Sequence, residues 1–171
     1  MSMIRRAVLV GLAAALAVGA GFAEEKNVKG KYQVIEVARF DIKPGVEKFS
    51  PDWLITINEE LIKQLRETAK FKEVLFEAET PSDASAPTLL LVGTVTEYAP
   101  GNRAERYMIG FGAGKTKVKA HVKIMDKTTK EVLFEDDVDG KVIMGAVGGE
   151  SIDATRGLAK EVASKTKKKF F

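Results

Sequence analysis

The sequence predicts an α+β fold: a single mixed, largely antiparallel sheet of about five strands, flanked by two main helices. Two segments, one after residue 50 and one after residue 150, repeat apolar residues at the three- and four-residue spacing of an amphipathic helix. Between them, several segments carry the apolar alternation that is typical of strands. The resulting order of strand, helix, several strands and helix favours an α+β layer sandwich.

The amino-terminal half of this fold is expected to supply one strand and one helix. The strand lies between Tyr32 and Ile42, where apolar residues partly alternate before a Lys-Pro-Gly break. The helix begins around Pro51, with Ser50 as the N-cap, proline at the first helical position and Asp52 in the first turn. Its apolar face is predicted to comprise Trp53, Leu54, Ile57, Leu61, Leu65 and Ala69.

The middle of the chain predicts a short strand at residues 72–78, a loop at 79–87 and a longer strand from Leu89 to Tyr98. Two prolines mark the loop. Leu89, Leu90, Leu91 and Val92 are apolar on consecutive positions, which suits a central strand that is buried on both faces.

Residues 116–126 form the clearest alternating segment, with valine, alanine and isoleucine on one side. The other side carries Lys117, Lys119, His121 and Lys123. A turn at 126–130 leads into a returning strand at 131–138. In that strand Glu131, Glu135 and Asp137 are expected to face the lysines and help to set the register.

The carboxyl-terminal part is predicted to contain a short strand at 141–144 and a last helix capped by Ser151. The buried side of this helix is expected to comprise Ile152, Ala159, Val162, Ala163 and Thr166. Lys165 and Lys167–Lys169 would place cations on its last turn, where they stabilise a helix. A surface for anionic lipid is the alternative interpretation of these lysines.

Residues 1–23 have the pattern of a secretory signal peptide. Arg5 and Arg6 precede an apolar run from Ala7 to Ala20, and small residues stand at the two positions that a signal peptidase reads, Gly21 and Ala23. A transmembrane helix is the alternative, but the apolar run is shorter than the roughly 20 residues that a span needs. We therefore expect residues 24–171 to be a single α+β domain, in the periplasm or secreted, and without a cysteine for lipid attachment.

Composition excludes several classes of site. The chain has no cysteine and one histidine, which excludes disulfides, thiolate zinc sites, cysteine nucleophiles and multi-histidine metal centres. Removing Arg5 and Arg6 from the 27 basic residues leaves 25 against 24 acidic residues, a net charge of +1. The basic precursor is therefore no argument for a nucleic-acid partner.

Short motifs in the sequence do not support catalysis. The stretch before Lys115 resembles a phosphate-binding loop, but Ile109 stands where its first glycine is required. Glu135 to Gly140 resembles the start of a calcium-binding loop, with Ala146 in place of the bidentate glutamate. His121 is expected to be solvated, with neighbouring cations that oppose its protonation. A hydrolase that uses two carboxylates is not disproved, and no residue pair points to one.

Two glycine-rich, apolar segments are the unusual feature, around residues 103–114 and 144–149. Glycine permits close backbone approach, so both segments are explained as tight sheet corners. The alternative is one apolar contact surface for a partner or a membrane. The candidate partner-binding residues are Arg103, Arg106, Tyr107, Met108, Ile109, Gly110, Phe111, Gly112, Gly114, Met144 and Val147.

The same region carries a family resemblance. Glu97-Tyr98 with Pro100 to Tyr107, Gly110 to Lys115, and Asp126 with Thr129 and Glu131 to Leu133 resemble an uncharacterised bacterial envelope family. It is the domain of unknown function numbered four thousand four hundred and ten. The outline is also similar to domains of the TolB amino-terminal and curli-secretion lipoprotein type. Where this family usually has a glycine in the hairpin turn, the chain has Lys130.

The resemblance implies a mixed sheet flanked by helices and a role in assembly or partner binding, by analogy of fold. We therefore expect a secreted bacterial envelope protein that is not an enzyme and has no cofactor or metal, acting as a binding or assembly module. The alternative is an oligomeric component of an outer-membrane secretion or assembly complex. The expected partner is another protein or further copies of the chain, with membrane-surface contact as a further alternative and no nucleic acid.

Overall fold

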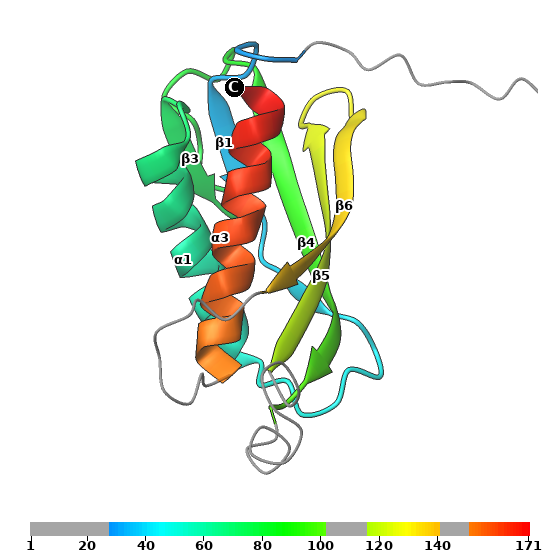
Figure 1. Cartoon of the computed structure of the whole chain (residues 1–171). Coiled ribbons are helices and arrows are strands. Elements are labelled where there is room, and N and C mark those ends of the chain that lie inside the picture. Colours follow the sequence, from blue (N-terminus) through cyan, green and yellow to red (C-terminus); the bar gives the residue numbers. More distant parts are fainter. Residues whose placement is uncertain (1–27, 102–115, 141–150) are drawn as a thin grey trace, which may run out of the picture.

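The computed structural model describes residues 28–101, 116–140 and 151–171 (Figure 1). Within these ranges the protein has two layers. One layer is a mixed sheet, and the other is formed by helices α1 (Asp52–Thr68) and α3 (Ser151–Phe170), which lie side by side on the same face of the sheet. The α+β class predicted from the sequence is therefore confirmed.

The sheet has six strands in the described ranges. They are β1 (Val34–Val37), β2 (Asp41–Ile42), β3 (Glu73–Phe76), β4 (Thr88–Ala99), β5 (Lys117–Asp126) and β6 (Val132–Gly140). The order across the sheet is β3-β1-β4-β5-β6, and β2 also pairs with β4. The long pairings β4–β5 and β5–β6 are antiparallel, whereas β1–β3, β1–β4 and β2–β4 are parallel.

The sixth strand arises because the predicted first strand is interrupted. Both β1 and β2 run parallel to β4, pairing with its residues 88–91 and 94–95 respectively. Between them, Phe40 is fully buried in the core. The Phe40 ring therefore contributes to the core at the point where β1 and β2 separate.

The helices bury the centre of the faces that periodicity predicts, but Trp53, Leu54, Ala69 and Ile152, which were expected on those faces, are only half-buried. In α1 the buried residues are Ile57, Asn58, Leu61 and Leu65. In α3 they are Ala154, Thr155, Gly157, Leu158, Ala159, Val162, Ala163, Thr166 and Phe170. The last turn of α3 carries Lys167, Lys168 and Lys169, as expected for cations at a helix carboxyl end.

The predicted serine cap of α1 is wrong. Pro51 is the N-cap of α1 and no side chain caps this helix, whose first turn is closed by backbone bonds to the carbonyls of Ser50 and Pro51. Ser151 is the first residue of α3, and its hydroxyl lies 2.6 Å from the hydroxyl of Tyr98. At the start of α1, main-chain bonds take the place of the predicted side-chain cap.

The two faces of the sheet differ in character. On β4, Leu89, Leu91 and Val95 are buried under the helices, while Leu90 and Val92 are half-buried on the opposite face. The strand is central, as predicted, but it is not fully buried on both sides. We call the face away from α1 and α3 the open face. The charged side chains that lie on it are Lys117, Lys119, His121 and Lys123 of β5 and Glu135, Asp137 and Asp139 of β6.

Candidate functional site

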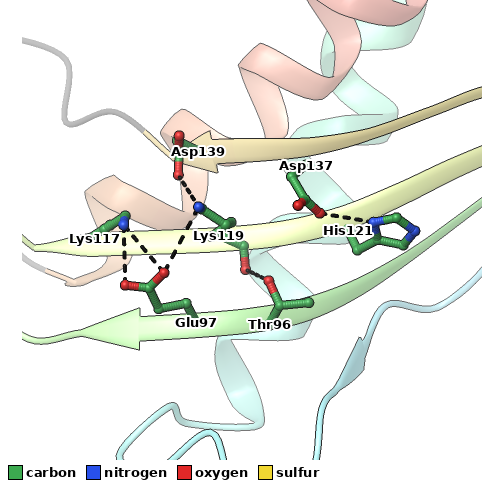
Figure 2. A network of polar contacts seen from close by, with 7 residues as sticks. All are labelled: Thr96, Glu97, Lys117, Lys119, His121, Asp137 and Asp139. Carbon is green, nitrogen blue, oxygen red and sulfur yellow. Dashed lines mark hydrogen bonds and ion pairs between the residues drawn. The ribbon is translucent and has the colours of Figure 1, made fainter.

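A ladder of ion pairs crosses the open face. Glu97 at the end of β4 bonds Lys117 at 3.1 Å and lies 4.0 Å from Lys119. Lys119 in turn lies 3.8 Å from Asp139 on β6 (Figure 2). The strict alternation of β5 places these lysines on one face, and the antiparallel register sets each beside a carboxylate.

His121 continues this ladder further along β5. Its Nδ1 lies 2.9 Å from Asp137 and its Nε2 lies 2.9 Å from Glu135. Glu135 also bonds Lys123 at 3.1 Å. The prediction that Glu135 and Asp137 face the basic side of β5 is confirmed, and the ladder ties together the three longest strands.

The predicted electrostatics of His121 were wrong. The hydrogen bond to Asp137, followed by the bond to Glu135, raises the pKa of His121 above its ordinary value, although partial burial opposes this. The lysines beside His121 on β5 bond carboxylates themselves, so their repulsion is largely neutralised. When His121 is protonated it donates to both carboxylates, and it then has no lone pair with which to accept a proton.

A second ion pair lies behind β6, on the side of the helices. Lys165 of α3 bonds Asp136 at 2.8 Å. This bond lowers the pKa of Asp136 and raises the pKa of Lys165. One member of the predicted lysine cluster is therefore engaged in holding α3 against β6.

A groove of about 920 Å³ runs along the outer side of α1, next to the end of the sheet that β3 occupies. Its lining includes the apolar side chains of Leu54, Ile55 and Ile62 from α1 and Phe76 from β3. Ile55 is 59% exposed, which is unusual for a large aliphatic side chain. We call this feature the α1 groove.

Asn58 lines the same groove and is unsatisfied. The residue is only 5% exposed, and its Oδ1 has no hydrogen-bond partner. A buried acceptor without a partner costs roughly 1–3 kcal/mol. The polar wall of the groove comprises Arg39, Asp52, Glu59, Lys63, Arg66 and Glu67, with equal numbers of acidic and basic side chains.

The neighbouring sheet edge is already occupied by the chain itself. Arg66 donates to the Val74 carbonyl, Phe76 N–H donates to the Glu79 carboxylate, and Glu79 N–H donates to the Phe76 carbonyl. An incoming strand would have to displace these bonds before it could pair with β3. The groove is therefore accessible to side chains, while the edge beside it is protected.

The predicted partner-binding residues, from Arg103 to Gly114 and at Met144 and Val147, lie outside the described residues, as do the signal peptide and the strand at 141–144. The residues that flank them are described. Ala99 pairs with Lys117, and Val118 pairs with Gly140. The Tyr98–Ser151 contact adds the start of α3, so both glycine-rich segments depart from the same end of the sheet.

Sequence reasoning did not find the α1 groove. Two signals were available: Ile55 stands on the polar side of the helix, and Asn58 interrupts the apolar stripe beside Ile57 and Leu61. Either alone is an ordinary departure from amphipathicity. Together they indicate a groove only once the fold places Phe76 and Arg39 beside α1.

The described part of the chain holds neither a cluster of metal-binding side chains nor a membrane-spanning helix. Within residues 28–101, 116–140 and 151–171, no three His, Asp or Glu side chains gather closely enough to hold a metal ion. Neither helix in these ranges combines the length and apolar composition that a bilayer crossing requires.

Comparison with solved structures shows the same fold in two structures of PelC. A PelC dodecamer from Paraburkholderia phytofirmans is 14% identical with a TM-score of 0.56, over 82% of this chain and 90% of that chain. A second crystal form of the PelC dodecamer from that organism is 16% identical with a TM-score of 0.54, over 78% and 88%. TolB from Acinetobacter baumannii is 10% identical with a TM-score of 0.39, over 82% and 29%.

Sequence comparison confirms the family that the motifs indicated. No curated protein shows significant similarity to the chain. A family model, described as Domain of unknown function (DUF4410), matches residues 23–146. Since this match spans well over half of the sequence, the chain belongs to the DUF4410 family.

Proposed function

We propose that this protein is a non-enzymatic assembly module of the bacterial cell envelope that works by associating with further copies of itself. One observation carries the proposal: the fold matches PelC structures described as dodecamers, and the match spans 90% of the PelC chain. Because the match covers nearly the whole PelC chain, it compares this fold with a complete PelC protomer and not with a fragment of one.

The chemistry of the open face supports a role other than catalysis. Its charged groups are paired with one another, and both nitrogens of His121 are bonded to carboxylates. A general base needs a free lone pair within reach of its substrate. This face serves to hold β4, β5 and β6 in register.

The proposed function requires that the chain is exported to the cell envelope. The pattern of residues 1–23 supports cleavage after Ala23. Expression of the full sequence in a bacterial host, followed by intact mass measurement of the periplasmic fraction, tests this. A mass that begins at Glu24 supports export, and an uncleaved chain in the cytoplasm contradicts it.

The two glycine-rich segments are proposed as contact surfaces in the assembly. Their flanking residues meet at one end of the sheet, which favours a shared surface. Replacing Met108, Ile109 and Phe111 together with serine should weaken association at least tenfold without lowering the melting temperature by more than a few degrees. If association is unchanged, these segments are not the contact.

The solution mass of the purified protein tests the function itself. Light scattering across a wide concentration range, with and without anionic lipid vesicles, should show a discrete multimer at high concentration. A species that remains monomeric at every concentration contradicts self-association. Co-sedimentation with vesicles would add the membrane surface as a contact.

A second function is favoured by the α1 groove: a monomeric module that binds a different protein. The unsatisfied Oδ1 of Asn58 in an apolar groove is the specific observation behind it. A monomer that is indifferent to lipid, together with a defined binding partner that protects Ile55 from solvent, would support this function over self-association.

A further inference from the structure

We infer that copies of this protein associate head to tail, with the β6 edge of one copy seated in the α1 groove of the next. The inference rests on the proposed self-association and names the two surfaces that would carry it. Neither surface includes the glycine-rich segments.

The first argument is the position of exposed apolar side chains. Among the described residues, two large hydrophobic side chains are exposed, Ile55 at 59% and Val132 at 46%. Ile55 belongs to α1, which packs on the β3 end of the sheet, and Val132 begins β6 at the opposite end. Figure 1 shows α1 and β6 on opposite flanks of the molecule.

This placement determines the kind of contact. A two-fold dimer buries one surface against an identical copy of itself, so it would leave either Ile55 or Val132 exposed. A head-to-tail contact buries both, because each copy contributes a different surface to each neighbour. Such contacts close into rings when the rotation between neighbours permits.

Val132 belongs to a small apolar row that widens the second surface. In the register of the sheet, Leu90 on β4 faces Met125 on β5, and Met125 faces Val132. Leu90 and Met125 are half-buried, so Val132 is the exposed end of a row supported by apolar neighbours. A row of this kind matches an apolar groove better than an isolated valine would.

An unsatisfied acceptor in the groove can be paired with a backbone donor of β6. Asn58 Oδ1 has no partner in the groove. Among the described residues β6 is the last strand of the sheet, so within them about half of its backbone N–H groups face away from β5. A β6 edge in the groove would therefore bury apolar area and satisfy this acceptor at the same time.

The alternative contact at this flank, strand addition to β3, is disfavoured. Arg66 and Glu79 already bond the Val74 and Phe76 backbone groups at that edge. The β6 edge of a second copy would therefore contact the side chains of the α1 groove and not the backbone of β3.

The experiment compares the wild-type chain with Ile55→Glu and Val132→Glu, using light scattering and sedimentation velocity on protein produced from the full sequence. Both positions are exposed, so each variant should keep the wild-type circular dichroism spectrum and a melting temperature within a few degrees. Thr128→Glu, an exposed change in the β5–β6 turn, is the matched control. We expect at least tenfold weaker association for I55E and V132E and no change for T128E.

Mixing the two variants separates a head-to-tail contact from a two-fold one. I55E retains an intact β6 edge and V132E retains an intact groove, so an equimolar mixture should form a dimer that grows no further. Each variant alone should associate at least tenfold more weakly than the mixture. Asn58→Ala provides a milder second probe, with the expectation of weaker association at unchanged or higher stability of the monomer.

The outcomes distinguish the inference from the function it rests on. A wild-type multimer that persists in I55E and V132E overturns the assignment of these surfaces while self-association stands. A mixture that remains monomeric, or a V132E chain that still forms two-fold dimers, also overturns it. A wild-type chain that stays monomeric at all concentrations overturns both.

Discussion

The ring of Phe40 occupies the space directly over Gly93. A Cβ atom added to Gly93 would overlap the Phe40 ring, which is fully buried between the sheet and the helices. The glycine in β4 therefore creates the room into which the chain turns between β1 and β2. This contact explains why a strand that is otherwise rich in leucine and valine contains a residue without a side chain.

Gly93→Ala should destabilise the fold by about 1–3 kcal/mol, because Phe40 must move out of a packed position. Urea unfolding followed by circular dichroism measures the change. Combining G93A with Phe40→Leu should cost less than the sum of the two single changes, since leucine leaves room for the added methyl group. Strict additivity in this cycle would contradict the contact.

His121→Gln should flatten the pH dependence of stability above the unfolded histidine pKa of about 6.5. Its hydrogen bonds to Asp137 and then Glu135 raise the pKa of His121 in the folded state. The pairing therefore stabilises most below the unfolded pKa of about 6.5 and is lost as pH rises through the folded pKa. Unfolding free energies from urea titrations at several pH values check this.

The size of this histidine effect should be about 0.2–1 kcal/mol, because the pairs are largely exposed to solvent. Lys119→Gln is the matched control. It changes a neighbouring side chain on the same strand and leaves the contacts of His121 with Asp137 and Glu135 in place, so its slope should equal that of the wild type. A wild-type slope in H121Q would show that His121 does not titrate as inferred.

Lys127→Met should destabilise the protein by about 1–3 kcal/mol. Lys127 bonds Glu36, whose side chain is only 10% exposed, and removing the cation leaves that carboxylate nearly buried without its ion pair. Lys123→Met breaks a pair with Glu135, whose side chain is 45% exposed, and should cost under about 1 kcal/mol. Equal costs for the two changes would contradict the difference in burial.

Lys130→Gly should stabilise the protein by up to about 1 kcal/mol. Lys130 has a φ of 61°, in the left-handed region, where a side chain costs energy that glycine avoids. The greater freedom of glycine in the unfolded chain offsets part of this gain. Thr128→Gly, at a turn position outside that region, should lower stability, and thermal melting of the two variants side by side distinguishes them.

The left-handed backbone of Lys130 explains why related sequences carry glycine at this position of the turn. The resemblance placed a glycine at this turn in related sequences, and this chain has a lysine there. The turn keeps its conformation because Asp126 accepts hydrogen bonds from the N–H groups of Thr128 and Thr129. The Asp126 carbonyl also accepts from Lys130 N–H. The turn geometry is thus held by Asp126 even without glycine.

The ion-pair ladder was predictable because it depends on period and register alone. Alternation in β5 placed Lys117, Lys119, His121 and Lys123 on one face, and a short turn fixed which residues of β6 meet them. The upward shift of the His121 pKa was not predictable in the same way. It depends on two carboxylates that both reach one ring, and the cations nearest in sequence pointed in the opposite direction.

The sequence by itself determined the class of fold, the two helices, the charged hairpin and the family, because each follows from periodicity or from a contiguous motif. Only the tertiary structure decided the parallel pairing of β1, β2 and β3, since pairing partners far apart in sequence leave no local signal. It also decided that Ile55 and Asn58 share a groove with Phe76 of β3. Such a surface is formed by packing energy between distant elements, and no single segment of the chain encodes it.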